Sequence, residues 1–447
     1  MMKFLVIGGD AAGMSAASKV KRNRPNYDVA VLEQTMDVSY SACGMPYNIA
    51  DPGRSIDDLV VRHADVFREK QGIDLRTGCR VESLNRTERN VTYTDSGGSE
   101  KVLPYDKLLI ATGASPVIPD LPGVLLPGVF VLKNLEDGRR IKKFIRENTV
   151  KKAVIIGMGY IALEMCEAFR ANDIDIGMVK PRPSFIPWMN GELAEMVLEE
   201  VEKNNVRIHA GHEISGIEKH DRGLRVICSG INIECDLVLI AIGVKPNSSL
   251  AGDAGLDLGP SESISVDKSL LTSDENIFAA GDCADAYHVV TGEKVWIPLA
   301  LRANRAGWAV ADNIIGDHTE ITGIVGTAVF KVFDLQVART GLSMGEAEKA
   351  GFDPVEAMIT GRSRAHAHPD SSIIGVQMVG DRKSGRLLGV QMVGKEGAAH
   401  RINAPAVALH AKMSVEKFSR CDLAYAPPFS PVWDPMLTAA LQLLKEM

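Results

Sequence analysis

One cysteine stands apart from the other six because of its neighbours. Cys43 lies in the stretch SYSACGMPY, residues 39–47, shortly after a glycine-rich N-terminal motif. A cysteine reacts as its thiolate, and a helix N-terminus beside the thiol lowers its pKa. Gly44 lets the backbone approach a flat ring, and Pro46 suits the first turn of a short helix that we expect from about Tyr47. Free cysteines are most often small buried residues, but the motifs that surround Cys43 favour a redox-active thiol.

The N-terminal residues carry the fingerprint of a dinucleotide-binding βαβ unit. Residues 3–8, KFLVIG, predict a buried parallel strand, and the helical stretch Met14–Arg24 follows the glycine-rich turn. In this fingerprint the glycines allow a tight turn and close packing of the helix, and the pyrophosphate lies on the helix N-terminus. An acid that closes the next strand, YDVAVLE, holds a ribose hydroxyl. The residues in these roles are Gly8, Gly9, Ala12, Gly13 and Glu33, whereas the middle glycine position holds Asp10.

Two later segments return to the same nucleotide site. Residues 105–113, YDKLLIATG, end in a Thr-Gly turn that lets the backbone pass close to a bound cofactor. Residues 276–284, NIFAAGDCA, predict a strand that runs into a helix, with Asp282 accepting hydrogen bonds from the ribityl hydroxyls of a flavin. A further helical stretch, Pro298–Ile315, is expected to point its N-terminus at the flavin ring. These segments add Thr112, Gly113, Gly281, Asp282, Pro298 and Ala300 to the predicted cofactor-binding residues.

The same signature recurs in the middle of the chain. Residues 153–157 predict a strand, and GMGYIA, residues 157–162, opens the next helix. Two such units indicate a flavin domain with a nicotinamide domain inserted into it. The second strand ends without an acid for the ribose 2′-hydroxyl, so Lys180 and Arg182 favour the 2′-phosphate of NADPH; the alternative is an ordinary solvated basic loop. The predicted NAD(P)-binding residues are Gly157, Gly159, Tyr160, Ile161, Glu164, Lys180, Arg182 and Gly243; Tyr160 is also a candidate lid over the nicotinamide pocket.

Length and composition fit an ordinary globular protein of two or three domains. The chain has 447 residues, of which 45% are hydrophobic and 24% charged, with a net charge of −7. This acidic balance argues against a nucleic-acid partner, and short, interrupted apolar runs argue against a membrane span or partner. The seven scattered cysteines lack a CxxC pair, and the N-terminus lacks a signal-peptide pattern. These features predict a reduced, cytoplasmic protein without a metal site.

These motifs resemble those of the FAD-dependent pyridine nucleotide–disulfide oxidoreductases. Residues 1–325 resemble the catalytic part of that family, and residues 326–447 resemble its dimerisation domain. The single cysteine resembles the branch of coenzyme A–disulfide reductases, NADH oxidases and NADH peroxidases, because the CxxxxC of dithiol members is absent. GGDAAGMS, residues 8–15, and DLAYAPPFS, residues 422–430, are most similar to coenzyme A–disulfide reductases.

The resemblance implies cofactors, partners and further site residues. FAD and either NADPH or NADH are the implied cofactors, with coenzyme A bound at Cys43. A homodimer is implied, in which Tyr425 of one subunit reaches Cys43 of the other. Coenzyme A, or another small thiol or disulfide, is the implied substrate. Its phosphates are expected to meet Lys19 and Arg22, and the further substrate-binding candidates are Ser39, Arg62 and Arg305.

Several positions depart from that family pattern. Ala42 precedes Cys43, where the family often has Asn. The segment that holds a second active-site tyrosine in the family reads RAHAHPD here, residues 364–370, so either His368 replaces that tyrosine or the substrate end of the site differs. Alanines 11 and 12 stand where oxidases and peroxidases carry a His, which disfavours peroxide chemistry. Because the chain stops at Met447, we expect it to lack the rhodanese domain of the persulfide-reducing fusion members.

The sequence therefore predicts an α/β protein with two Rossmann-like three-layer domains and a C-terminal α+β dimerisation domain. We expect the FAD domain at 1–118 and 248–325, the NAD(P) domain at 119–247 and the dimerisation domain at 326–447. In the last of these, the repeated GVQMVG of residues 375–380 and 389–394 predicts two antiparallel strands joined by a turn.

The expected activity is FAD-dependent reduction of coenzyme A disulfide, or a related low-molecular-weight disulfide, by NAD(P)H. Cys43 and Tyr425 are the predicted catalytic residues. The alternatives are a coenzyme A persulfide or polysulfide reductase, an NAD(P)H oxidase in which Cys43 passes through a sulfenic acid, and a redox-sensing flavoprotein.

Overall fold

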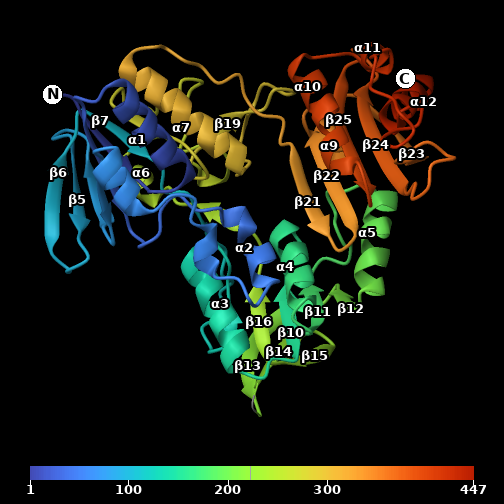
Figure 1. Cartoon of the computed structure of the whole chain (residues 1–447), viewed down its shortest axis with the longest axis horizontal. Helices are drawn as coiled ribbons and strands as arrows, with labels where there is room; N and C mark the ends of the chain where they lie inside the picture. The colour runs from blue at the N-terminus through green and yellow to red at the C-terminus, as the bar shows by residue number, and fades with distance from the viewer. Residues whose placement is uncertain (222) are drawn as a thin grey trace.

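Three five-stranded sheets organise the chain in the computed structural model, which describes every residue except residue 222. Two of these sheets are parallel and the third is antiparallel. Figure 1 shows them as the centres of three units, with the antiparallel sheet in the C-terminal part of the chain. The predicted fold class is thus confirmed. Among the helices of the described residues, none is both long enough and apolar enough to span a membrane.

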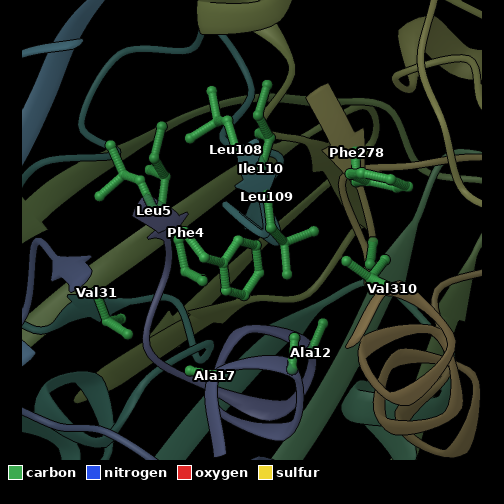
Figure 2. Packing of buried hydrophobic residues seen from close by; sticks show 14 of the residues in the cluster. Phe4, Leu5, Ala12, Ala17, Val31, Leu108, Leu109, Ile110, Phe278 and Val310 are labelled. Atoms are coloured by element: carbon green, nitrogen blue, oxygen red, sulfur yellow. The ribbon is translucent and has the colours of Figure 1, made fainter. Parts of the chain in front are cut away.

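The first unit is a parallel sheet in the strand order β18-β7-β1-β2-β3. Its strands are apolar and buried, as in other parallel sheets that are covered on both faces. Figure 2 shows Leu5, Leu109 and Phe278 of this sheet packing with Ala12 and Val310 from helices α1 and α7. The elements are β1 (Lys3–Ile7), α1 (Ala11–Asn23), β2 (Asp28–Glu33), β3 (Asp74–Thr77), β7 (Lys107–Ile110), β18 (Ile277–Ala279) and α7 (Ala300–Ile315), with a side sheet of β4 (Arg80–Asn85), β5 (Asn90–Thr94) and β6 (Glu100–Pro104).

The second unit repeats this plan in the strand order β12-β11-β10-β16-β9. A three-stranded antiparallel sheet again accompanies the parallel one. The parallel strands and helices are β9 (Val129–Phe130), α3 (Leu135–Glu147), β10 (Lys152–Ile156), α4 (Tyr160–Arg170), β11 (Asp175–Lys180), α5 (Gly191–Lys203), β12 (Val206–Ala210) and β16 (Leu237–Ile240). The antiparallel strands are β13 (Ile214–His220), β14 (Gly223–Cys228) and β15 (Ile231–Cys235).

Two short strands run side by side where the chain passes between the first two units. β8 (Ala114–Pro116) pairs antiparallel with β17 (Val244–Pro246). Next to them, the Thr112 hydroxyl donates to the Asn247 carbonyl at 2.6 Å, and the Asn247 amide donates to the Thr112 carbonyl at 2.8 Å. These reciprocal hydrogen bonds fix the Thr-Gly turn that the sequence places at the nucleotide site.

The third unit is the antiparallel sheet β21-β22-β25-β24-β23 with helices beside it. The predicted pair of antiparallel strands is confirmed, because β24 and β25 pair with Gln377 opposite Gln391. The strands are β21 (Ala328–Val332), β22 (Leu335–Gly341), β23 (Pro354–Arg362), β24 (Ile373–Asp381) and β25 (Leu387–Gly394). The helices are α8 (Met344–Lys349), α9 (Ala398–Arg401), α10 (Asn403–His410), α11 (Val415–Ser419) and α12 (Pro435–Glu446).

The predicted helix directly after Asp282 is wrong. The chain instead turns into the short hairpin β19 (Ala286–Tyr287) and β20 (Lys294–Val295). The Trp296 indole donates to the Asp282 carbonyl at 2.8 Å, and the buried Arg302 guanidinium donates to the Ala284 carbonyl at 2.8 Å. These long-range donors satisfy carbonyls that a helix would otherwise use, so the turn is stable without one.

Candidate redox site at Cys43 and the nucleotide-binding turns

The glycine-rich turns of the first two units share one backbone geometry. Gly8 has a φ of +111° and Gly157 a φ of +117°, values that side chains with a Cβ rarely adopt. A Cβ on Gly8 would lie 2.2 Å from the Ala111 oxygen, and a Cβ on Gly157 would lie 2.2 Å from the Ala241 oxygen. In the first unit, β1 therefore ends beside β7, which leads to the predicted turn at Thr112–Gly113. In the second unit, β10 ends beside β16, which leads to the predicted turn at Gly243.

The glycine-rich turn at Gly8 packs against helix α1, and α1 in turn packs against the chain just after β18. A Cβ on Gly13 would lie 1.9 Å from the Gly8 oxygen, so glycine at this position lets α1 pack on the turn. A Cβ on Gly281 would lie 3.2 Å from the Ala12 Cβ. The structure thus brings four of the predicted cofactor-binding residues together at the carboxyl edge of the sheet, where ligands of open α/β sheets bind.

Glu33 lies at the edge of this turn, as the fingerprint predicts. Its carboxylate accepts hydrogen bonds from the Gly9 amide at 2.7 Å and from the Thr35 amide at 2.7 Å. These bonds orient the carboxylate toward the glycine-rich turn.

Lys133 is a site residue that sequence reasoning missed. Its ammonium donates to the Asp282 carboxylate at 3.0 Å across 149 residues of sequence. Lys133 comes two residues before α3, whose N-terminus Asn134 and Asp137 close with a capping box. The second unit therefore supplies a cation to the carboxylate predicted to hold the flavin ribityl chain. A lone lysine before a helix gives no signal for such a contact.

Cys43 lies at the start of two short helical turns. The single helical turn η1 (Ala42–Gly44) is followed by α2 (Met45–Ile49), which begins two residues earlier than predicted. The Ser41 amide donates to the Leu59 carbonyl at 2.8 Å and holds this segment against its neighbour. Cys43 is exposed and Cys421 is half-buried, whereas the other five cysteines are buried. Cys43 is therefore the thiol best placed to meet a substrate.

The thiol of Cys43 differs electrostatically from the sequence-based expectation. Although Cys43 is exposed, partial desolvation of its sulfur and the Glu164 carboxylate raise the pKa of the thiol, while the Lys133 ammonium opposes them. The predicted lowering of this pKa is wrong, because burial of the sulfur, the largest contribution, and the surrounding carboxylates raise it. Lys133, Glu164 and Asp282 are among the groups that contribute to this shift. The Ser39 and Tyr40 amides bond to Gly9 and Asp10, which joins the Cys43 loop to the glycine-rich turn.

Tyr47 is a second residue that sequence reasoning missed. Its hydroxyl donates to Glu164 at 2.7 Å and joins α2 to α4. Burial raises the pKa of the Glu164 carboxyl. The structure therefore shows Glu164, a predicted cofactor-binding residue, bonded to the helix that follows Cys43.

Tyr160, the candidate lid, lies in an aromatic cluster. Its ring packs 4.7 Å from that of Phe330 on β21 and 5.3 Å from that of Trp188. In this conformation the ring contacts the third unit. Ile161, the next residue of α4, is partly exposed.

The predicted 2′-phosphate residues lie at the end of β11, with Lys180 as its last residue and Arg182 two residues later. The Lys180 ammonium donates to the Phe185 carbonyl at 3.0 Å, and burial together with Arg182 lowers the pKa of Lys180. Arg182 is exposed. Arg182 is thus the more accessible of the two cations, and both roles stay predictions.

The structure divides the predicted substrate-binding residues. The Ser39 carbonyl accepts from the Arg62 amide at 3.3 Å, which brings these two residues together beside the Cys43 loop. Lys19 is paired with Asp312 at 2.6 Å and lies over the Trp308 ring. Its ammonium is therefore already neutralised within the chain. The remaining substrate-binding candidates, Arg22 on α1 and Arg305 on α7, are exposed. Tyr425, the second predicted catalytic residue, is half-exposed in the segment 422–430 of the third unit.

Residues 2–307 match the pyridine nucleotide-disulphide oxidoreductase family, and residues 327–436 match the dimerisation domain of the same family. The chain belongs to this family. Its members carry FAD and a pyridine nucleotide, and the chain is an FAD-dependent NAD(P)H oxidoreductase. The glycines without room for a Cβ, Glu33 and the Lys133–Asp282 pair fit a bound dinucleotide. FAD, when bound there, supplies a carrier for two electrons between a nicotinamide and a sulfur group.

The chain is similar in sequence or structure to the following three members of the family. The NAD(P)H sulfur oxidoreductase (CoA-dependent) of Pyrococcus furiosus is 40% identical over 98% of both chains. The coenzyme A disulfide reductase of Staphylococcus haemolyticus is 27% identical over 96% of both chains. The solved structure of an NAD-dependent persulfide reductase from A. fulgidus has a TM-score of 0.96 and 34% identity, covering 100% of this chain and 83% of that one.

Proposed function

We propose that this enzyme uses NAD(P)H to reduce a sulfur–sulfur bond next to coenzyme A, with Cys43 as the attacking thiol. One observation carries the proposal: Cys43 is an exposed thiol in a loop whose Ser39 and Tyr40 amides bond to Gly9 and Asp10 of the glycine-rich turn. The relatives named for CoA-dependent sulfur, persulfide and coenzyme A disulfide reduction support the substrate class. Both a disulfide and a persulfide of coenzyme A present the sulfur chemistry that such a thiol attacks.

The proposed reaction is thiol–disulfide exchange. The Cys43 thiolate attacks one sulfur of the substrate, which forms a mixed disulfide and releases the other sulfur group as a thiolate that takes up a proton. Two electrons from NAD(P)H then break the mixed disulfide, and this restores the Cys43 thiolate and releases the second thiol. Because the surroundings of Cys43 raise the pKa of its thiol, deprotonation is the step that needs help. The Lys133 ammonium is the neighbouring group that favours the thiolate.

We also propose a homodimer in which Tyr425 of one subunit serves Cys43 of the other as proton donor. The match of residues 327–436 to a dimerisation domain supports this assembly. Exposed apolar side chains in two places also support it: Leu301 and Trp308 on α7, and Phe429, Val432 and Trp433 in the chain after Tyr425. The division into an FAD domain (1–118 and 248–325), an NAD(P) domain (119–247) and a dimerisation domain (326–447) is proposed with these boundaries. All seven cysteines are free thiols, which supports a cytoplasmic location.

The mass of the purified protein tests the proposed substrate class. Under denaturing conditions without reductant, we expect an adduct of roughly 765 Da, one coenzyme A in disulfide linkage to a cysteine. Proteolytic mapping should place it on Cys43, and dithiothreitol should remove it. An added oxygen in place of the adduct would instead support oxidase chemistry, and a bare thiol after incubation with coenzyme A disulfide would contradict the proposal. Turnover with coenzyme A disulfide against coenzyme A persulfide then identifies the preferred acceptor.

The basic residues Lys180 and Arg182, at and just after the end of β11, predict a preference for NADPH. Replacing exposed Arg182 with serine removes a charge-assisted contact to the 2′-phosphate, so KM for NADPH should rise about tenfold while KM for NADH changes little. Lys180→Ser would also remove the hydrogen bond from the Lys180 ammonium to the Phe185 carbonyl, so a change in KM could come from an altered loop. Initial rates of flavin reduction with each nucleotide measure the effect. Equal changes for both nucleotides would show that Arg182 is an ordinary solvated residue.

A further inference from the structure

Asp10 occupies the middle glycine position of the first dinucleotide fingerprint. It directly precedes α1, where an aspartate commonly caps the helix with its side chain. In the described structure its carboxylate instead accepts a hydrogen bond from the Tyr40 amide at 3.3 Å, and no side-chain bond to α1 is formed. Tyr40 stands three residues before Cys43. The side chain that departs from the fingerprint thus contacts the loop that carries the redox cysteine.

A second hydrogen bond joins the same two segments. The Ser39 amide donates to the Gly9 carbonyl at 3.1 Å. Ser39 itself has a φ of +49°, a left-handed conformation that a serine holds only when its surroundings impose it. On the other side, the Ser39 carbonyl accepts from the Val61 amide at 2.9 Å. The entrance to the Cys43 loop is therefore held in a strained conformation between the glycine-rich turn and the chain near Val61.

We propose that Asp10 is a positioning residue for Cys43: its carboxylate ties the backbone at Tyr40 to the dinucleotide-binding turn and so fixes the loop that presents the thiol. The inference rests on the proposed function only in taking Cys43 as the reacting group. It assigns Asp10 no contact with substrate. A glycine at this position, as the fingerprint prescribes, would remove the Tyr40–Asp10 bond. Of the two hydrogen bonds described above, the Ser39–Gly9 bond alone would then join the Cys43 loop to the glycine-rich turn.

The charge of Asp10 also acts on the thiol. Burial and the carboxylates of Glu33 and Asp282 raise the pKa of Asp10 to about 6, against the Tyr40 amide and the Lys133 ammonium. The two carboxylates belong to β2 (Glu33) and to the chain after β18 (Asp282). The Tyr40 amide belongs to the Cys43 loop, and Lys133 lies before α3. Ionised Asp10 in turn belongs to the groups that raise the pKa of Cys43. Removing its charge should therefore favour the Cys43 thiolate, whereas removing its hydrogen bond should loosen the loop.

Two substitutions separate these effects in the FAD-loaded enzyme. Asp10→Gly restores the standard fingerprint, removes both the bond and the charge, and should retain FAD. Asp10→Asn removes the charge but keeps an oxygen that can accept from the Tyr40 amide. The matched control is Asp58→Asn, which removes the charge of a half-exposed aspartate in η2 (Ile56–Leu59) paired with Arg54.

The readouts are amide hydrogen exchange of the peptide covering residues 38–44 and the pH dependence of Cys43 alkylation by iodoacetamide. We expect exchange in that peptide to be about fivefold faster in Asp10→Gly, because a hydrogen-bonded tie is lost, and close to wild type in Asp10→Asn and in the control. The midpoint of the alkylation profile should move to lower pH in Asp10→Asn and stay in place in the control.

Either of two results would overturn the proposal. Unchanged exchange in an Asp10→Gly protein that holds FAD would show that the bond does not position the loop. If that variant loses FAD or does not fold, unchanged exchange in Asp10→Ala, which also removes the bond, overturns the proposal instead. Neither readout depends on turnover. A failure of the proposed function, such as disulfide reduction without Cys43, would thus be distinguishable from a failure of this inference.

Discussion

Replacing Cys43 with serine should lower the rate of disulfide or persulfide reduction by at least about a thousandfold, because a hydroxyl cannot form the mixed disulfide. Reduction of the flavin by NAD(P)H should continue in the same variant. The predicted nicotinamide-binding residues belong to the second unit. They lie in the turn after β10, on α4, at and just after the end of β11, and after β16, and the substitution alters none of them. Stopped-flow absorbance of the flavin measures the first half-reaction, and release of free thiol under steady-state conditions measures the second.

The matched control for this experiment is Cys421→Ser. Cys421 is the half-buried cysteine of the third unit, with its thiol bonded to the Lys417 carbonyl. This variant should keep wild-type thiol release, so a loss confined to Cys43→Ser identifies the attacking sulfur. Undiminished thiol release by Cys43→Ser would refute the proposed mechanism. Loss of both half-reactions would instead point to a damaged flavin site.

The backbone of the nucleotide site was predictable because its residues obey local rules. Gly8 and Gly157 have positive φ and face a carbonyl at a distance that leaves no space for a Cβ. Any other residue at these positions would disrupt the unit, so the glycines mark the turns in the sequence itself. The β24–β25 pair was equally accessible, since two apolar repeats flank a turn sequence and their strands pair directly.

The side-chain partners at the site were not predictable, because they join residues far apart in the chain. Lys133 meets Asp282 across 149 residues, and Tyr47 meets Glu164 across 117 residues. No local sequence motif around Lys133 or Tyr47 indicates which distant residue it will contact. These contacts also explain the error on the pKa of Cys43: the sequence indicated the adjacent helix, whereas burial and the carboxylates brought in by the fold determine the direction of the shift.

The error after Asp282 has the same origin. A strand followed by Gly-Asp-Cys-Ala reads as a strand that leads into a helix, but the carbonyls of that segment bond to Trp296 and Arg302. Arg302 is buried, and its guanidinium can be accommodated there because the carbonyls of this turn accept its hydrogen bonds. The local sequence therefore specifies the strand, while side chains from later in the chain determine the conformation of the residues after it.

Arg401→Met should lower the free energy of unfolding by about 3 kcal/mol, since it removes the charged partner of the buried Asp434 carboxylate. The Ser430 hydroxyl and the Met436 amide would still donate to that carboxylate. The Arg401 guanidinium donates to the Asp434 carboxylate at 2.8 Å, and their side chains are 11% and 8% exposed. It also donates to the Phe429 carbonyl at 2.8 Å and to the Ser363 carbonyl at 3.0 Å. One side chain therefore holds the segment between Tyr425 and α12 against α9 and the end of β23.

Urea denaturation at a fixed protomer concentration measures this loss, because the stability of an oligomer depends on concentration. The control is Arg420→Met, which breaks an exposed pair with Glu416 whose side chains are 76% and 59% exposed. A surface pair of this kind contributes at most about 1 kcal/mol, so the control should unfold near the wild-type midpoint. Equal midpoints for Arg401→Met and wild type would show that the Asp434 carboxylate finds another partner or water.

The same substitution connects the fold to the proposed chemistry. If Tyr425 serves Cys43 of the partner subunit, loosening the segment that carries it should slow thiol release in Arg401→Met well below the melting transition. Flavin reduction by NAD(P)H should be spared, because the predicted FAD and NAD(P) residues lie in the other two units. A fall in both half-reactions together would mean that the third unit supports the whole enzyme through its stability. A fall in thiol release alone would mean that the Arg401–Asp434 pair positions the tyrosine.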